Sequence, residues 1–190
     1  EKFSGFSIQG VPPIHCQRKF CEKNKIEFEE IGLILNDHNS NKISSSAIRE
    51  NLKSGKFELA NKDLERNFSV AGKVIKGDQR GRTIGIPTAN LEYPLNTITI
   101  PYGVYAVETL IEGNTYFGIV NFGIRPTFNK DKPIVEAYLF DFDNDIYGKN
   151  IEILFHKQIR QEKKFNDIKE LLNQINIDIA EAKKILKYGN

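Results

Sequence analysis

The stretch ITIPYGVYAVETLIEGNTYFGIVNFGI (residues 98–124) contains two runs rich in β-branched and aromatic residues, with turn residues between them. Short runs of this kind with a period of two predict β-strands. Similar runs occur on both sides of this stretch: FSVAGKVIKG (68–77), RTIGIPTANLEY (82–93), PIVEAYLFDF (133–142) and KNIEILFHKQI (149–159). About six strands within about 90 residues predict a mainly β fold, a closed or nearly closed antiparallel barrel, because closure removes exposed strand edges.

The last segment, FNDIKELLNQINIDIAEAKKILKY (165–188), has a different period. Its apolar residues recur at helical spacing, which predicts an amphipathic helix lying on the barrel. The residues of this apolar stripe are Phe165, Ile168, Leu171, Leu172, Ile175, Ile179, Ala182 and Leu186.

Residues 1–67 also differ from the barrel. The run at 17–26 is polar and helix-like, and the run at 27–35 resembles a strand. Serines at 44–46 can cap a helix that ends near Gly55, and a second short helix follows. We therefore place a domain boundary between residues 67 and 68.

Bulk composition argues against some classes of partner. The chain of 190 residues has a net charge of +2 and no methionine, even at position 1. Because position 1 is not methionine, we expect an incomplete chain. The balanced charge predicts no nucleic-acid partner. The lack of a long apolar segment predicts no membrane partner. Cys16 and Cys21 form neither a disulfide framework nor a zinc pattern, which favours a reducing cytoplasmic location.

The segment GDQRGRTIGIPTAN (77–90) is either an ordinary hairpin or a phosphate-binding loop. Gly77 and Gly81 would let backbone N–H groups approach an anion. Thr88 and Asn90 follow a proline and carry oxygens that suit Mg²⁺ or phosphate. No Walker A or dinucleotide pattern is present, so the segment alone leaves both interpretations open.

Glu136 lies within a predicted strand, on the same face as Ile134 and Tyr138. It is either an edge residue facing water or an acid of a functional site. Near Asn90 it could act as a general base on a hydroxyl group. The acidic run at 141–152 is interpreted as a charged turn, because the sixth position of a calcium loop requires glycine and is Ile146 here.

The serine run at residues 44–46, with Arg49 one turn later, is a second candidate site for an anion. A helix N-terminus offers free N–H groups and a favourable dipole to phosphate. Simple helix capping explains the serines as well, so the pattern alone does not decide between the two.

Taken together, several linked motifs resemble the riboflavin kinase (flavokinase) family, in order and spacing, over residues 68–190. The matching segments are GKVIKGDQRGRTIGIPTANL (72–91), GVYAV (103–107), NFGIRPTF (121–128), VEAYLFDFDNDIYGK (135–149) and IRQEKKF (159–165). The resemblance implies a six-stranded Greek-key barrel that transfers a phosphoryl group from ATP to riboflavin and yields FMN.

The chain looks most similar to the bacterial bifunctional riboflavin kinase/FMN adenylyltransferases, in which this domain is C-terminal. Residues 1–67 would then be an α/β remnant of a Rossmann-like nucleotidyltransferase domain. The family motif I-S-S-T-x-I-R corresponds to Ile43, Ser44, Ser45, Ser46, Ala47, Ile48 and Arg49, with Ser46 in place of threonine. The family's G-x-F-D-x-x-H-x-G-H motif is not in the sequence, so the adenylyltransferase activity of this chain is in question.

The resemblance also implies roles for individual residues. Thr88 and Asn90 would hold Mg²⁺ and the ATP phosphates, and Glu136 would be the general base. The nucleotide flap would comprise Gly77, Arg80, Gly81, Arg82 and Thr83, with Tyr147 near the ATP base. Arg160 and Lys163 would belong to the segment that closes over the flavin.

A second hypothesis is a regulatory barrel that binds flavin or nucleotide without chemistry. It differs from the enzyme at Glu136 and Asn90, because a binding module needs no base beside a metal ligand. A third is an oligonucleotide-binding barrel, which would need a basic groove with exposed aromatic side chains. The balanced charge argues against it.

Overall fold

The computed structural model describes residues 13–30, 43–77, 81, 84–94, 96–124 and 133–189, and the chain divides into two compact units, 1–42 and 43–190. In the first unit, α1 (Ile14–Lys23) confirms the expected helix, and Arg18 pairs with Glu30 at 2.7 Å. Residues 27–30 form no strand, contrary to the prediction, and 31–35 lie outside the described residues.

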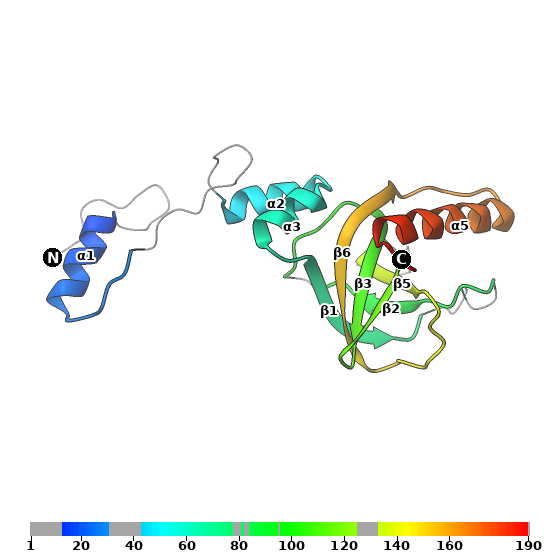
Figure 1. Ribbon diagram of the computed structural model, residues 1–190, viewed down its shortest axis with the longest axis horizontal. Coiled ribbons are helices and arrows are strands. Elements are labelled where there is room, and N and C mark those ends of the chain that lie inside the picture. Colours follow the sequence, from blue (N-terminus) through cyan, green and yellow to red (C-terminus); the bar gives the residue numbers. More distant parts are fainter. Residues whose placement is uncertain are drawn as a thin grey trace. The chain divides into compact units, whose positions relative to one another are not determined.

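The second unit is built around a closed antiparallel barrel (Figure 1). In the described part of the chain, six strands follow one another around it in the order β1-β2-β5-β4-β3-β6. Their bounds are β1 Phe68–Ile75, β2 Ala89–Glu92, β3 Gly103–Ile111, β4 Asn114–Ile124, β5 Pro133–Leu139 and β6 Asn150–Gln161. The predicted six-stranded barrel is thus confirmed.

The barrel interior is filled by the apolar residues that alternate along the strands. Tyr105, Phe122, Val135, Ile153 and Phe155 are all fully buried there. Residues at the intervening positions therefore lie on the outer face of the barrel, which is where polar side chains can form a site.

Strand β2 is shorter than the sequence predicts. The run at 82–93 reads as one strand, but pairing begins only at Ala89. Gly85 has a φ of +78°, and Pro87 has no N–H to donate, so neither continues a strand ladder. The described residues 84–88, directly before Ala89, form no strand.

Two helices that precede the barrel pack against one end of it (Figure 1). They are α2 (Ser45–Lys53) and α3 (Phe57–Leu64), with Ser44 as the N-cap of α2 and Gly55 at a φ of +76° after it. Phe57 is fully buried among the rings of Phe68, Tyr105 and Phe155. Residues 43–67 therefore share the core of the barrel.

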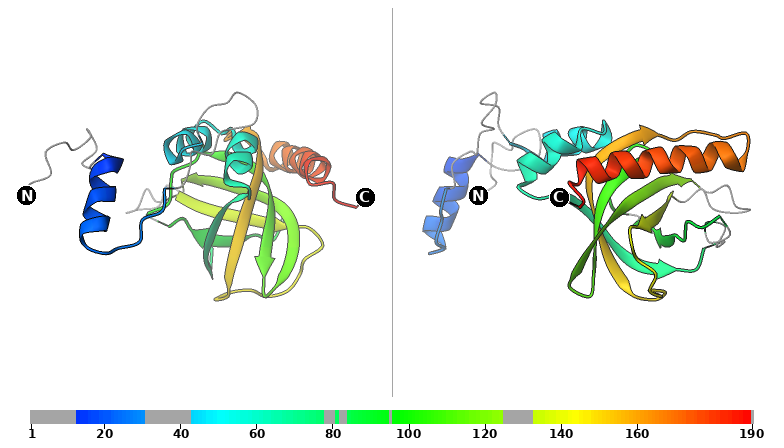
Figure 2. Two further views of the ribbon diagram at one scale, coloured as in Figure 1. Left: turned by 60° about the vertical axis from the view of Figure 1, so that its left-hand side comes forward. Right: turned by 45° about the vertical axis from the view of Figure 1, so that its right-hand side comes forward.

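The C-terminal helix α5 (Ile168–Ile185) lies along the outside of the barrel, as predicted (Figure 2). Ile175, Ile179 and Ala182 pack with Val104 and Ile119 of β3 and β4. Two members of the predicted stripe behave differently. Phe165 precedes the helix, whose N-cap is Asp167, and the side chain of Ile168 is 61% exposed.

Candidate active site

A row of directly paired residues crosses five neighbouring strands of the barrel. Asn90 of β2 is opposite Glu136 of β5, and Glu136 is opposite Asn121 of β4. Asn121 is opposite Val104 of β3, which is opposite Arg160 of β6. Directly opposite residues point to the same face of a sheet. The neighbours of these residues fill the interior, so this row lies on the outer face.

The two predicted residues Asn90 and Glu136 are thus brought side by side. Opposite residues of an antiparallel pair have Cβ atoms about 5 Å apart, which is within reach of both side chains. Asn90 is only 3% exposed, whereas Glu136 is half-buried. A carboxylate and a carboxamide that meet on a partly covered surface can bind a polar substrate group between them.

Gly77 covers the side chain of Asn90. A Cβ atom added to Gly77 would lie 2.4 Å from Nδ2 and 2.6 Å from Cγ of Asn90. Only a glycine allows the backbone to approach this closely. The same amide nitrogen, Nδ2, donates a hydrogen bond of 3.4 Å to the carbonyl oxygen of Thr88. Asn90 is therefore fixed between the start and the end of the 77–90 segment.

Gly81 forms a turn within the same segment. Its carbonyl oxygen accepts hydrogen bonds from the N–H groups of Ile84 at 3.2 Å and Ile86 at 2.8 Å. A Cβ atom at Gly81 would lie 2.2 Å from the carbonyl oxygen of Ile86. The remaining residues of the predicted flap, Arg80, Arg82 and Thr83, lie outside the described residues.

Thr88 and Tyr147, which are far apart in the sequence, line one pocket of about 220 Å³. Its apolar side includes Val74 and Leu139, and the turn after β5 supplies much of the remaining wall. In that turn the Asp145 carboxylate accepts a hydrogen bond from the backbone N–H of Tyr147 at 3.0 Å. The pocket is apolar with a few polar groups, which is typical of small-molecule sites.

Thr88 and Asn90 have the oxygen donors that a divalent cation such as Mg²⁺ requires. Asn90 is buried, and its carboxamide packs against the backbone of Gly77. Among the described residues there is no group of three or more His, Cys, Asp or Glu side chains that could hold a metal ion. One or two protein oxygens such as those of Thr88 and Asn90 are enough for an ion that phosphates and water otherwise hold.

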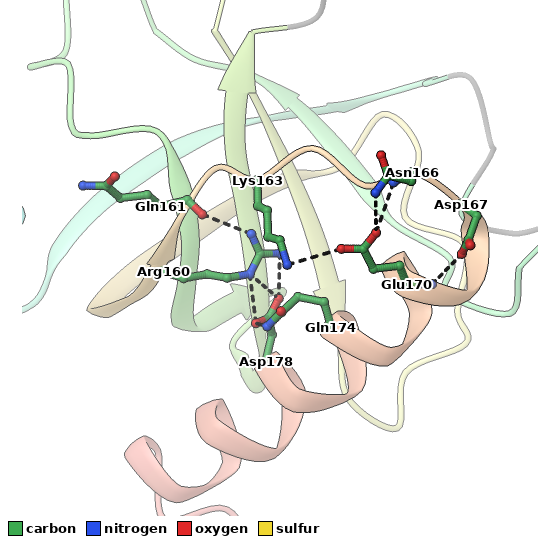
Figure 3. Close-up of polar contacts among 8 residues, drawn as sticks. All are labelled: Arg160, Gln161, Lys163, Asn166, Asp167, Glu170, Gln174 and Asp178. Atoms are coloured by element: carbon green, nitrogen blue, oxygen red, sulfur yellow. Dashed lines mark hydrogen bonds and ion pairs between the residues drawn. The ribbon is translucent and has the colours of Figure 1, made fainter.

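Arg160 ends the row on the other side, and its guanidinium contacts helix α5 (Figure 3). It donates two hydrogen bonds from Nε to the Asp178 carboxylate, at 3.0 and 2.9 Å, and forms an ion pair of 2.8 Å with it. Lys163 contacts Glu170 of the same helix at 3.4 Å. The predicted flavin segment thus begins at the row and is attached to α5.

The serine motif lies elsewhere, at the start of α2. The Ser44 hydroxyl accepts a hydrogen bond of 3.2 Å from the backbone N–H of Ala47, which is an ordinary N-cap. Ser45, Ser46 and Arg49 are exposed on the first turns of the helix. Helix capping therefore explains Ser44, while the other three side chains face solvent.

Three residues of the site escaped sequence reasoning. Asn121 is hidden in an apolar strand, and its position opposite Glu136 depends on which strands pair. Asp178 and Gln174 lie on α5, and a signal for Asp178 was available. It falls between Ile175 and Ala182 on the buried side of the helix, where a carboxylate needs a partner.

Within the described part of the chain, α5 and the shorter helices are all too polar or too short to cross a lipid bilayer.

Comparison with known proteins gives consistent matches. The family model of riboflavin kinase (flavokinase) matches residues 64–186. The chain is 49% identical over 144 residues to the bifunctional riboflavin kinase/FMN adenylyltransferase of Bacillus subtilis, covering 74% of this chain and 46% of that protein. It is 42% identical over 163 residues to the protein of the same description from Buchnera aphidicola of Acyrthosiphon pisum, covering 84% and 52%.

The chain spans about half the length of these curated relatives. Among solved structures, the crystal structure of a macrolide-efflux protein from Streptococcus pneumoniae matches with a TM-score of 0.78 and 29% identity. That match covers 95% of this chain and 57% of the other. Because the family model spans more than half of the sequence, from α3 through the barrel to α5, the chain belongs to the riboflavin kinase (flavokinase) family.

Proposed function

We propose that the chain phosphorylates riboflavin, transferring the γ-phosphoryl group of ATP to the ribityl 5′-hydroxyl to give FMN. The observation that carries this proposal is the direct pairing of Asn90 with Glu136. It is supported by membership of the family and by the relatives, which are named as riboflavin kinases.

In the proposed reaction the 5′-hydroxyl oxygen bonds to the γ-phosphorus, and the bond from that phosphorus to the β,γ-bridging oxygen breaks. ADP leaves, and the hydroxyl proton passes to the Glu136 carboxylate. Phosphoryl transfer depends mainly on positioning and charge stabilisation, so one base beside a phosphate site is sufficient. Glu136 lies one strand away from the phosphate site proposed at Asn90.

The nucleotide is proposed to occupy the pocket that Thr88 and Tyr147 line. Its phosphates would extend toward Asn90, next to Gly77 and Gly81. Close approach of this backbone would let N–H groups bind phosphate oxygens. Arg80, Arg82 and Thr83 are proposed to complete this flap over the nucleotide.

Thr88 and Asn90 are proposed to hold Mg²⁺ together with the phosphates. When bound, the ion would neutralise charge on the transferred phosphoryl group. Both residues keep their oxygens close to the flap because Asn90 is packed under Gly77 and bonded to the Thr88 carbonyl.

The flavin is proposed to lie on the other side of Glu136, toward β4 and β6. The segment that begins at Arg160 and carries Lys163 leaves the barrel at this side. Its attachment to α5 supports a role as the cover of the flavin site.

The whole protein is proposed to make FAD as well, as the bifunctional relatives are named to do. In that reaction Ser45, Ser46 and Arg49 would contact phosphate.

We retain the boundary between residues 67 and 68 as a proposal, with 1–67 as part of the adenylyltransferase domain. The free Cys16 and Cys21 fit the proposed cytoplasmic location, and small molecules are the proposed partners.

Incubation of the chain with riboflavin, ATP and Mg²⁺, followed by chromatography, tests the kinase. FMN should accumulate, with one ADP formed for each FMN. Riboflavin binding without FMN formation would instead favour the regulatory barrel. The Glu136→Gln variant is the matched control, because it keeps the shape of the site and removes the base.

A further inference from the structure

Asp178 is a buried carboxylate that belongs to no part of the proposed reaction. Its side chain is 1% exposed although it lies on the surface helix α5. Arg160 approaches it with both Nε and a terminal nitrogen, and Gln174 donates a further hydrogen bond of 3.0 Å to Oδ1 (Figure 3). Arg160 also donates to the carbonyl oxygen of Gln161 at 3.1 Å.

A buried ion pair of this kind adds little net stability compared with apolar residues of the same volume, because both charges lose their hydration. What it adds here is a fixed geometry. The planar guanidinium meets the carboxylate through several bonds, which sets both the distance and the orientation of Arg160. The backbone of β6 is therefore held to α5 one residue before the strand ends.

A side chain of the segment that leaves this point reaches the outer face of β4. A Cβ atom at Gly123 would lie 2.2 Å from Oε1 of Glu162, so the Glu162 carboxylate rests on the backbone of Gly123. Gly123 is two residues from Asn121 on the same face of β4, and Asn121 is opposite Glu136. The segment 161–166 thus begins beside the row that contains the proposed base.

The other end of the segment is held by a weaker set of contacts. Glu170 accepts a hydrogen bond of 3.2 Å from the backbone N–H of Asn166 and pairs with Lys163 at 3.4 Å. The Lys163 and Glu170 side chains are 52% and 37% exposed, so water competes for this pair. The Phe165 ring folds back to within 5.6 Å of the Arg160 guanidinium. Only the Arg160 end has a buried anchor.

We propose that Asp178, supported by Gln174, is a positioning residue for the flavin side of the active site. It acts through Arg160, fixing where the 161–166 segment leaves β6, in the same row as Glu136 and three strands away from it. This inference rests on the proposed riboflavin kinase function. It predicts that loss of the anchor weakens the use of riboflavin and leaves the use of ATP unchanged, because the nucleotide pocket lies on β2 and the turn after β5.

The test compares Asp178→Asn and the milder Gln174→Met with Glu58→Gln. The last variant is a control that breaks another ion pair of β6, between Lys157 and Glu58 at 2.8 Å. Asp178→Asn should raise the KM for riboflavin about ten- to a hundredfold, with the KM for ATP unchanged. Gln174→Met should cause a smaller rise in the same constant, and Glu58→Gln should cause none.

Amide hydrogen exchange without substrates gives a second measurement. Exchange in residues 161–166 should be faster in Asp178→Asn and Gln174→Met than in Glu58→Gln. An unchanged riboflavin KM with unchanged exchange overturns the proposal, as does an equal rise in both KM values. If the wild-type chain forms no FMN, the proposed kinase function is wrong. Amide hydrogen exchange then still shows whether Asp178 positions the segment.

Discussion

Glu136 of β5 lies directly opposite Asn90 of β2, and both side chains lie on the outer face of the barrel. They are 46 positions apart in the numbering of the chain, so only the pairing of β2 with β5 joins them. The relationship places a carboxylate next to a buried carboxamide at the end of the nucleotide segment. In the proposed mechanism Asn90 would hold the phosphate end of the donor next to this base.

Replacement of Glu136 by glutamine should slow turnover by about 10²–10⁴, because the amide cannot accept the hydroxyl proton. Nucleotide affinity should stay near that of the wild type, since the pocket at Thr88 and Tyr147 is untouched. Steady-state formation of FMN and equilibrium binding of ATP measure the two effects. Near-normal turnover in this variant would remove Glu136 from the mechanism.

Alanine at Gly77 should disturb Asn90 directly. The new Cβ atom would lie 2.4 Å from Nδ2 of Asn90, so the buried carboxamide must move. We expect kcat to fall about ten- to a hundredfold. Gly72→Ala is the matched control in β1, because its Cβ atom would meet nothing closer than 3.4 Å. Equal activity of the two variants would contradict the close packing of Gly77 on Asn90.

Much of this fold could be predicted from the sequence, and the reason is the period of two. The predicted strand segments lie where the structure has β1 to β6, and the apolar stripe predicted α5. The pairing of Asn90 with Glu136 could not be predicted from alternation, because it depends on the order of strands around the barrel. Alternation also made the predicted strand at 82–93 longer than β2, because Gly85 and Pro87 interrupt pairing.

Phe57→Ala should destabilise the barrel by about 3–5 kcal/mol, although Phe57 precedes the first strand. The ring is 0% exposed and packs 5.2 Å from the Tyr105 ring, centroid to centroid. Chemical denaturation followed by far-UV circular dichroism measures the loss in the free energy of unfolding. Leu59→Ala on the same helix is the control, because that side chain is 49% exposed and its loss should cost little. Similar losses in both variants would show that α3 does not share the barrel core.

Thr109→Val should stabilise the protein by about 1 kcal/mol. The Thr109 side chain is fully buried, and within the described residues its hydroxyl has no hydrogen-bond partner. Valine has nearly the same shape and removes this unsatisfied group. Thr109→Ser keeps the hydroxyl and should not stabilise. Thermal unfolding of the three proteins distinguishes these outcomes, and a lower stability for valine would mean that the hydroxyl is satisfied.

The attachment of the 161–166 segment at Glu170 should weaken in acid, because the carboxyl loses its charge. The backbone N–H of Asn166, and then Lys163, hold the pKa of Glu170 below its ordinary value of 4.5. A carboxyl whose pKa is lowered in the folded state contributes stability above its unfolded pKa, and this contribution is lost as the pH falls through the folded pKa. The Asn166 amide resonance should therefore titrate with a midpoint below 4.5. Glu170→Gln can still accept the Asn166 bond but has no charge, so the titration should disappear in that variant. A wild-type midpoint at or above the ordinary value would show that Asn166 and Lys163 do not hold the carboxylate.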